Sequence, residues 1–163
     1  MSDVNDDPIA AIEQGLTGVV RQANLPRAHA RFAAAAGVPL LDKSAYFVLG
    51  RIGDEGPMRL SELADALGVE PSTVSRQVSE LERAGFVERR TDERDARASR
   101  LFLTRSGQRT LANLRRARRE LITELVADWT AEERTTLARL LPKLADSLAA
   151  RAGREVTAHA LQP

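Results

Sequence analysis

Five arginines and three acids lie between residues 89 and 104, in the stretch RRTDERDARASRLFLT. Guanidinium groups bind oxyanions such as phosphates through paired hydrogen bonds, and a nearby carboxylate can hold a guanidinium in one orientation. Asp95 and Arg97 have that relation, two residues apart. Over residues 86–119, eleven arginines stand against four acids, a local balance of +7 in a chain whose net charge is +1. This concentration indicates a polyanionic partner, and a solvated charged face is the simpler alternative.

A second set of polar side chains follows Pro71, a residue that suits the first position of a helix. Val74, Val78 and Leu81 have the spacing of an apolar stripe. If that stripe faces a core, the opposite face carries Ser72, Arg76, Ser79 and Arg83, with Thr73 and Gln77 beside it. In a DNA major groove, arginine can bind guanine and glutamine can bind adenine, while short hydroxyls favour phosphates or closely approached bases.

The elements that would position these side chains follow from apolar spacing and from glycine and proline. Helices are expected over 8–35 (interrupted by Pro26), 44–52, 60–67, 71–84 and 105 to about 128. A last helix is expected to open with the capping box of residues 130–133 and to bend at Pro142. Thr104 is placed to cap the helix that follows it. Two short extended runs, FVERR and RLFLT, enclose the arginine-rich tip.

The fold class predicted from this order is mainly α with a small antiparallel β-wing. The helices of 60–67 and 71–84, joined at Gly68-Val-Glu-Pro71, are a candidate helix-turn-helix whose second helix could enter a major groove. An ordinary helical hairpin with a solvated polar face is the competing interpretation, since such hairpins are common.

Residues 60–107 resemble the winged helix-turn-helix of the MarR family of bacterial transcription regulators. The resemblance rests on five pieces in combination. They are LA at 63–64, STVSR at 72–76, L-E-x-x-G-x-V-x-R at 81–89, D-x-R at 95–97 and L-T-x-x-G at 103–107. The flanking helices match the family's layout rather than its motifs.

This resemblance implies a winged helix-turn-helix flanked by dimerisation helices: residues 1–42 and 105–163 for dimerisation, 43–104 for DNA. It implies a homodimeric, sequence-specific regulator, a ligand-responsive repressor that binds a pseudo-palindromic operator. The recognition-helix residues carried over are Ser72, Thr73, Ser75, Arg76 and Gln77. The wing residues are Arg97 for the minor groove, Asp95 as its orienting partner and Arg94 for a phosphate.

Members of the family often bind small aromatic or anionic effectors between the dimer region and the winged domain. The residues expected at such a pocket are Phe32, Tyr46, Phe47 and Arg51. Each aromatic could instead fill the core, and a lone arginine is more often a surface residue. The chain departs from the family pattern at Arg59, Glu70, Ala96, Pro26 and Pro142, and the two prolines bear on the dimer and the pocket.

Other function classes receive little support from the residue types. The chain has no cysteine and only two separated histidines, His29 and His159, so thiol chemistry is excluded and neither a metal nor a cofactor is expected. No P-loop, nucleophile elbow or dinucleotide loop indicates an enzyme. No signal peptide or membrane span is evident, so a cytoplasmic protein is expected. A non-specific architectural DNA-binding protein remains the alternative to a sequence-specific regulator.

Overall fold

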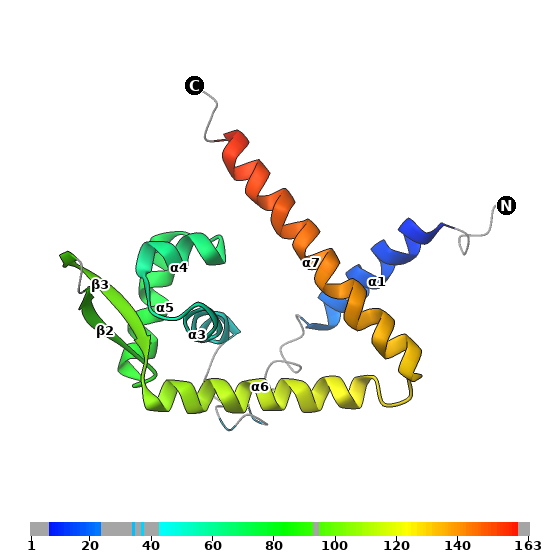
Figure 1. The fold of residues 1–163 in the computed structure, drawn as a ribbon, viewed down its shortest axis with the longest axis horizontal. Helices are drawn as coiled ribbons and strands as arrows, with labels where there is room; N and C mark the ends of the chain where they lie inside the picture. Colours follow the sequence, from blue (N-terminus) through cyan, green and yellow to red (C-terminus); the bar gives the residue numbers. More distant parts are fainter. Residues whose placement is uncertain (1–6, 24–33, 35–36, 38–42, 93–94, 160–163) are drawn as a thin grey trace. The chain divides into compact units, whose positions relative to one another are not determined.

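The computed structural model describes residues 7–23, 34, 37, 43–92 and 95–159. The chain divides into two compact units, residues 1–121 and 122–163. Across the described residues the helices and strands are α1 (Pro8–Ala23), α3 (Lys43–Glu55), β1 (Met58–Arg59), α4 (Leu60–Leu67), α5 (Pro71–Arg83), β2 (Val87–Asp92), β3 (Asp95–Leu103), α6 (Arg105–Leu125) and α7 (Ala131–His159). Figure 1 shows this order in the ribbon. The predicted fold class, mainly α with a small antiparallel sheet, is confirmed.

The core of the first unit lies among α3, α4, α5, the sheet and the first half of α6. Its fully buried side chains are Val48, Leu49, Leu63, Val74, Val78, Leu101 and Leu114. The predicted stripe of α5 is confirmed, since Val74, Val78 and Leu81 are all buried. The helix α4 turns one face to the same core: Leu63 and Ala64 are buried, and Leu60 and Leu67 pack against it.

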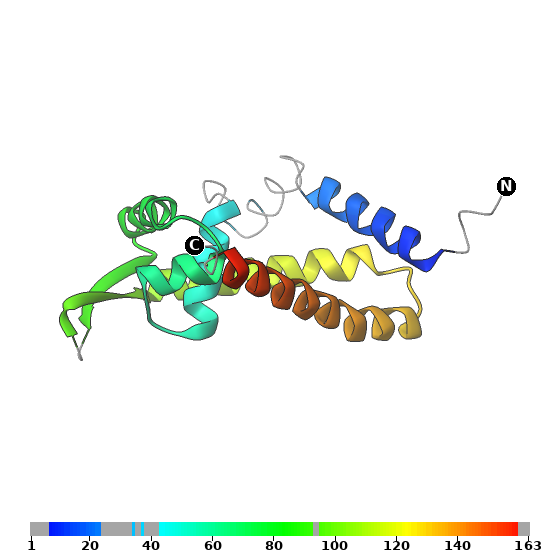
Figure 2. The same ribbon diagram turned by 90° about the horizontal axis from the view of Figure 1, so that it is seen from above.

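The sheet has three strands in the order β1-β3-β2, all antiparallel. The two-stranded hairpin was predicted, but β1 was not, because its two residues are too short for an alternating pattern. Residues 87–91 of β2 pair with residues 99–103 of β3, and the register becomes irregular between Thr91 and Asp92. The wing, defined as β2 and β3, extends past α4 and α5 (Figures 1 and 2).

The turn between α4 and α5 has the geometry of a helix-turn-helix. Gly68 ends α4 with φ 64, in the left-handed region that glycine adopts without strain. The N–H groups of Gly68 and Val69 donate to the carbonyls of Asp65 and Ala64, both at 3.2 Å. Pro71 then begins α5 as its first residue. The sequence signals for this turn are therefore confirmed in detail.

Thr104 joins the wing to α6. Its backbone N–H donates to the Phe86 carbonyl at 3.0 Å, and its hydroxyl donates to the Gly85 carbonyl at 2.6 Å. The hydroxyl oxygen accepts from the Gly107 N–H at 3.0 Å, which confirms the predicted cap. Gly107 lies against the same segment, because a Cβ built there would be 2.0 Å from the Phe86 carbonyl oxygen.

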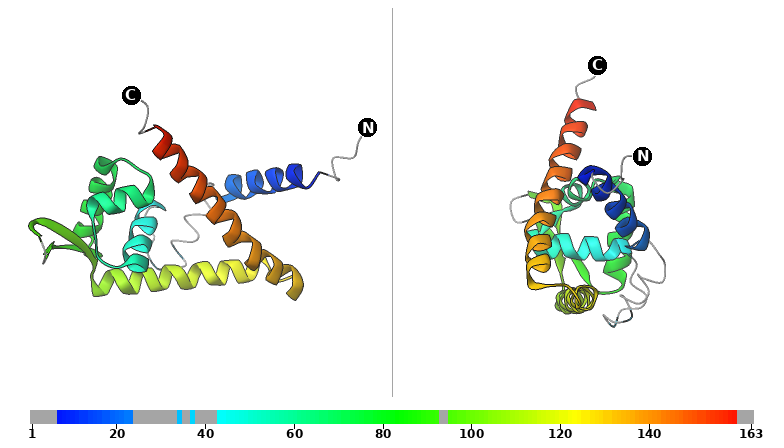
Figure 3. Two further views of the ribbon diagram at one scale, coloured as in Figure 1. Left: turned by 45° about the horizontal axis from the view of Figure 1, so that its top comes forward. Right: turned by 90° about the vertical axis from the view of Figure 1, so that its right-hand side faces the viewer.

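Other predicted boundaries differ from the structure. The helix expected over 44–52 continues to Glu55, so Gly53 lies inside α3 rather than ending it. The apolar stripe of α6 divides in two: Leu111 and Leu114 are buried, whereas Leu121 and Leu125 are exposed. Pro26 lies outside the described residues. Pro142 lies inside α7, which runs as one helix from Ala131 to His159 (Figure 3), and the bend expected there stays a prediction.

The capping box predicted for the last helix is present. The Glu133 carboxylate accepts from the Thr130 N–H at 2.7 Å, and the Glu133 N–H donates to the Thr130 hydroxyl at 3.2 Å. The backbone hydrogen bond from Thr130, followed by the one from its side chain, lowers the pKa of Glu133 below its ordinary range. The ionised carboxylate therefore stabilises the start of α7.

Replacing Gly107 with alanine should destabilise the first unit. The new Cβ would force Phe86 away from α6, and overpacking of this kind costs about 1–3 kcal/mol. Thermal or urea unfolding measures the effect. Gly50→Ala is the matched control, because nothing lies within 4 Å of its added Cβ, and helix propensity should then raise stability by roughly 0.5–1 kcal/mol. Equal stability of Gly107→Ala and the wild type would contradict this packing.

The lowered pKa of Glu133 makes the stability of α7 depend on pH. The folded carboxyl binds fewer protons than the unfolded one, so its contribution is present above the unfolded pKa of about 4.3 and is lost as the pH falls through the lower folded pKa. Unfolding of the wild type and Glu133→Gln should therefore differ near pH 7 and converge at acid pH. A difference that did not change with pH would show that ionisation of Glu133 plays no part.

Candidate nucleic-acid interface

The outer face of α5 carries the polar residues predicted from the sequence. Ser72 and Arg76 are exposed, whereas Thr73, Ser75 and Gln77 are half-buried. This follows from the helical period, since Val74 and Val78 turn the opposite face into the core. Among the described residues, the Arg76 side chain makes no hydrogen bond or ion pair. Its guanidinium is therefore available to an external acceptor.

The first turn of α5 has no side-chain cap. Glu70 takes the N-cap position, but its carboxylate makes no capping hydrogen bond, and no acid lies in the first turn. The Glu70 carbonyl accepts from the N–H groups of Thr73 and Val74 at 3.0 and 3.2 Å. The positive end of the helix dipole thus remains open to an anion next to Ser72.

Of the wing residues predicted for the site, the structure describes the backbone of Asp95 and Arg97. Arg94 lies outside the described residues. Asp95 and Arg97 both belong to β3, and Asp95 pairs with Asp92 at the end of the ladder. Arg97 is therefore the third residue of β3, close to the end of the strand that faces the turn of the wing. The predicted orienting contact between Asp95 and Arg97 stays a prediction.

Several arginines of the opening stretch bind groups within the protein. Arg89 donates to the Glu82 carboxylate of α5 at 3.0 and 3.1 Å, which ties the wing to α5. Arg90 pairs with Glu88 and lies 4.6 Å from the centroid of the Phe102 ring. Arg100 donates to the Pro57 carbonyl at 2.6 Å. Several of these arginines therefore stabilise the wing through contacts within the protein.

Sequence analysis missed a partly buried ion pair between β1 and β2, in which the acid is buried and the arginine is partly exposed. Asp92 is only 8% exposed, and its carboxylate accepts from Arg59 Nε at 3.2 Å and Nη2 at 3.0 Å. The N–H of Arg59, the N-cap residue of α4, also donates to the Glu62 carboxylate in the first turn of that helix at 2.7 Å. The alternation of charge in the sequence did not show which acid meets which arginine, because the partners are 33 residues apart.

Three of the four predicted effector-pocket residues lie together. Tyr46, Phe47 and Arg51 line a cavity of about 580 Å³, together with Gln77 of α5 and Arg118 of α6. The Arg118 guanidinium lies 4.1 Å from the Tyr46 ring centroid, and the Tyr46 and Phe47 rings meet edge to face at 5.8 Å. Phe32 lies outside the described residues. Sequence analysis did not predict that Gln77 and Arg118 line this cavity, because both are far along the chain from Tyr46, Phe47 and Arg51.

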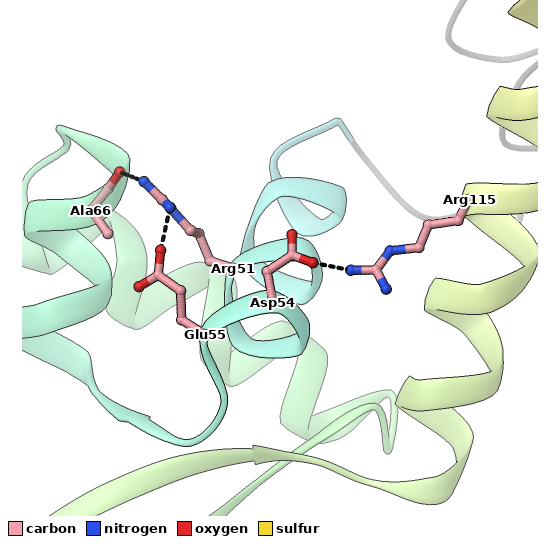
Figure 4. Close-up of polar contacts among 5 residues, drawn as sticks. All are labelled: Arg51, Asp54, Glu55, Ala66 and Arg115. Atoms are coloured by element: carbon pink, nitrogen blue, oxygen red, sulfur yellow. Dashed lines mark hydrogen bonds and ion pairs between the residues drawn. The ribbon is translucent and has the colours of Figure 1, made fainter. Parts of the chain in front are cut away.

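The Arg51 side chain already has binding partners within the chain, as Figure 4 shows. It forms an ion pair with Glu55 and donates to the Ala66 carbonyl at 3.0 Å. On the adjacent turn of α3, Asp54 pairs with Arg115 of α6. A hydrogen bond therefore links α3 to α4, and an ion pair links α3 to α6.

Within the described part of the chain, no group of three or more histidine, aspartate or glutamate residues could hold a metal ion. Over the same residues, none of the helices combines the length and apolar character that a membrane span requires.

Comparison with known proteins agrees with this geometry. The sequence profile of the MarR family matches residues 41–99. The chain is 29% identical to the uncharacterised HTH-type transcriptional regulator YxaD of Bacillus subtilis, over 86% of this chain and 94% of that protein. It is 33% identical to the HTH-type transcriptional regulator BilQ of Clostridium symbiosum, over 61% of this chain and 68% of that protein.

The fold is similar to solved structures of the same class. The crystal structure of MarR matches with a TM-score of 0.71 and 26% identity, over 94% of this chain and 98% of that one. The family and these relatives are transcriptional regulators rather than enzymes. The structure thus has the DNA-binding fold of a transcriptional regulator: α5 has an outward polar face, Gly68 forms the left-handed turn before it, and the wing is tied to it. The chain belongs to the MarR family.

Proposed function

We propose that this protein is a homodimeric, sequence-specific repressor that binds a pseudo-palindromic operator and responds to a small ligand. The observation that carries the DNA-reading part is the outer face of α5. Arg76 is exposed and unpaired among the described residues, and it lies one turn from the uncapped start of the helix. An arginine at this place can bind guanine in the major groove while the helix N-terminus binds a phosphate.

Five α5 residues form the proposed major-groove surface: Ser72, Thr73, Ser75, Arg76 and Gln77. In the wing, Arg97 is proposed for the minor groove, where a narrow groove concentrates negative potential, with Asp95 as its orienting partner and Arg94 at a phosphate. The Arg89–Glu82 contact supports coordinated docking, because it connects β2 to α5. An architectural protein would instead need no base contacts from α5.

Dimerisation is proposed through the terminal regions, residues 1–42 and 105–163, with 43–104 as the DNA-binding domain. Large apolar side chains are exposed at helical spacing on α7, at Leu137, Leu140, Leu141 and Leu148. The same is true of α1, at Ile9, Ile12, Leu16, Val19 and Val20. Apolar stripes of this kind mark interaction surfaces, because leaving them in water forgoes about 25 cal/mol per Å².

Repression is proposed to act by occlusion. A two-fold dimer reads half-sites about one helical turn, roughly 34 Å, apart, and would therefore cover a continuous stretch of promoter DNA. The cavity beside Tyr46 and Phe47 supports the ligand response, since Gln77 of the proposed reading surface also lines it. A small aromatic or anionic ligand there would contact Arg118 and α5 together.

Arg76→Ala should weaken operator binding by about 1–3 kcal/mol and relax specificity at one base position. Binding to the selected operator and to a set of single-base variants measures both effects. Arg83→Ala is the matched control, because that arginine is exposed on the same helix but lies in its last turn. A uniform loss on every sequence would assign Arg76 to a phosphate, and no loss would remove it from the interface.

Replacing Leu140 and Leu141 together with aspartate should convert the dimer to monomers, because the charges would be buried at the proposed α7 interface. Light scattering after size exclusion gives the molar mass. Arg139→Asp is the control, because it places an aspartate next to Leu140 in the sequence but leaves both leucines in place. This variant should remain dimeric. A stable dimer of the double variant would contradict the assignment of α7 to the interface.

A further inference from the structure

A second groove lies between α3, the base of the wing and α6. It has a volume of about 700 Å³, within the range of small-molecule sites. Its lining includes Ile52 of α3, Pro57 before β1, Leu103 of β3 and Leu111 of α6. It has no lining residue in common with the cavity beside Tyr46 and Phe47. The groove is therefore a separate candidate site.

The floor of this groove is apolar. Ile52 and Leu111 are each only 3% exposed, and Leu103 packs against the core beside them. Gly53 brings α3 close to α6 at this point, because a Cβ built there would be 2.3 Å from Leu111 Cδ2. The helices thus meet at the floor, and a hydrocarbon lying on it would be removed from water.

The rim of the groove is cationic. Arg115, Arg116 and Arg119 of α6 all line it. Arg115 pairs with Asp54 (Figure 4), whereas Arg116 Nε lies 3.9 Å from Glu120 Oε1, beyond hydrogen-bond distance. Both members of that second pair are about two-thirds exposed, so the interaction is weak. Arg116 therefore has donors that a better acceptor can take.

We propose that this groove binds a small apolar carboxylate, with its hydrocarbon on the Ile52–Leu103–Leu111 floor and its carboxylate at Arg116. The planar guanidinium of Arg116 presents two parallel donors that match a carboxylate. A neutral apolar molecule would leave the cationic rim unused. A bare phosphate would gain nothing from the floor. An amphipathic anion uses both parts of the groove.

Octanoate is the probe for the test, with octan-1-ol as its uncharged counterpart. Calorimetric or NMR titration of the full chain should show saturable binding of one octanoate per chain, weaker binding of octan-1-ol, and lower affinity at high salt. Ala112→Trp fills the groove from an exposed position of α6, and Arg116→Gln removes the cation. Each variant should weaken octanoate binding at least fivefold.

The matched controls lie on the same helix but outside the groove lining. Asn113→Trp and Arg109→Gln should bind octanoate as the wild type does. Binding that survives both Ala112→Trp and Arg116→Gln would overturn the proposal, as would the absence of saturable binding. Loss of binding in Phe47→Ser alone would place octanoate in the other cavity and also overturn it. Because the readout is ligand binding, the result is independent of whether the protein represses transcription.

Discussion

Burial of the α5 stripe is the interaction on which the rest of the structure depends. Val74, Val78 and Leu81 lie in the core, and α3 and α4 both contact α5 there. Once these side chains are buried, the helical period determines which residues of α5 face outward. The polar face that includes Arg76 is thus a consequence of packing. A change in how α3 supports α5 would move the same face without altering any of its residues.

Some arginines in and near the wing stabilise the fold and others are available to a partner, and a count of charges does not distinguish the two roles. Arg59 and Arg89 hold the sheet and α5 together through Asp92 and Glu82. Arg76 has no internal partner among the described residues and is free for an external one. An arginine with a buried or well-oriented acid therefore stabilises the fold, and an unpaired exposed arginine is the better candidate for binding. The same distinction identifies Arg116, whose acidic partner among the described residues, Glu120, lies beyond hydrogen-bond distance.

Local signals in the sequence predicted the helices and the hairpin well, but the sequence did not predict contacts between residues far apart in the chain. Gly68, the cap that Thr104 forms on Gly107 and the box at Thr130–Glu133 act between residues a few positions apart, so spacing alone located them correctly. The strand β1 is only two residues long and exists because Met58 pairs with Leu101. Tyr46, Phe47 and Arg51 were placed in one pocket, whereas the contributions of Gln77 and Arg118 required the tertiary structure. The assignments of Arg94, Asp95 and Arg97 remain predictions.

Selection of genomic DNA fragments by the purified protein at near-physiological salt tests the central claim most directly. The claim is that α5 reads bases from each subunit of a two-fold dimer. It predicts that the bound fragments share an inverted repeat whose half-sites lie about one helical turn apart. Fragments with no common sequence, bound with equal affinity, would contradict it and would support an architectural DNA-binding protein instead.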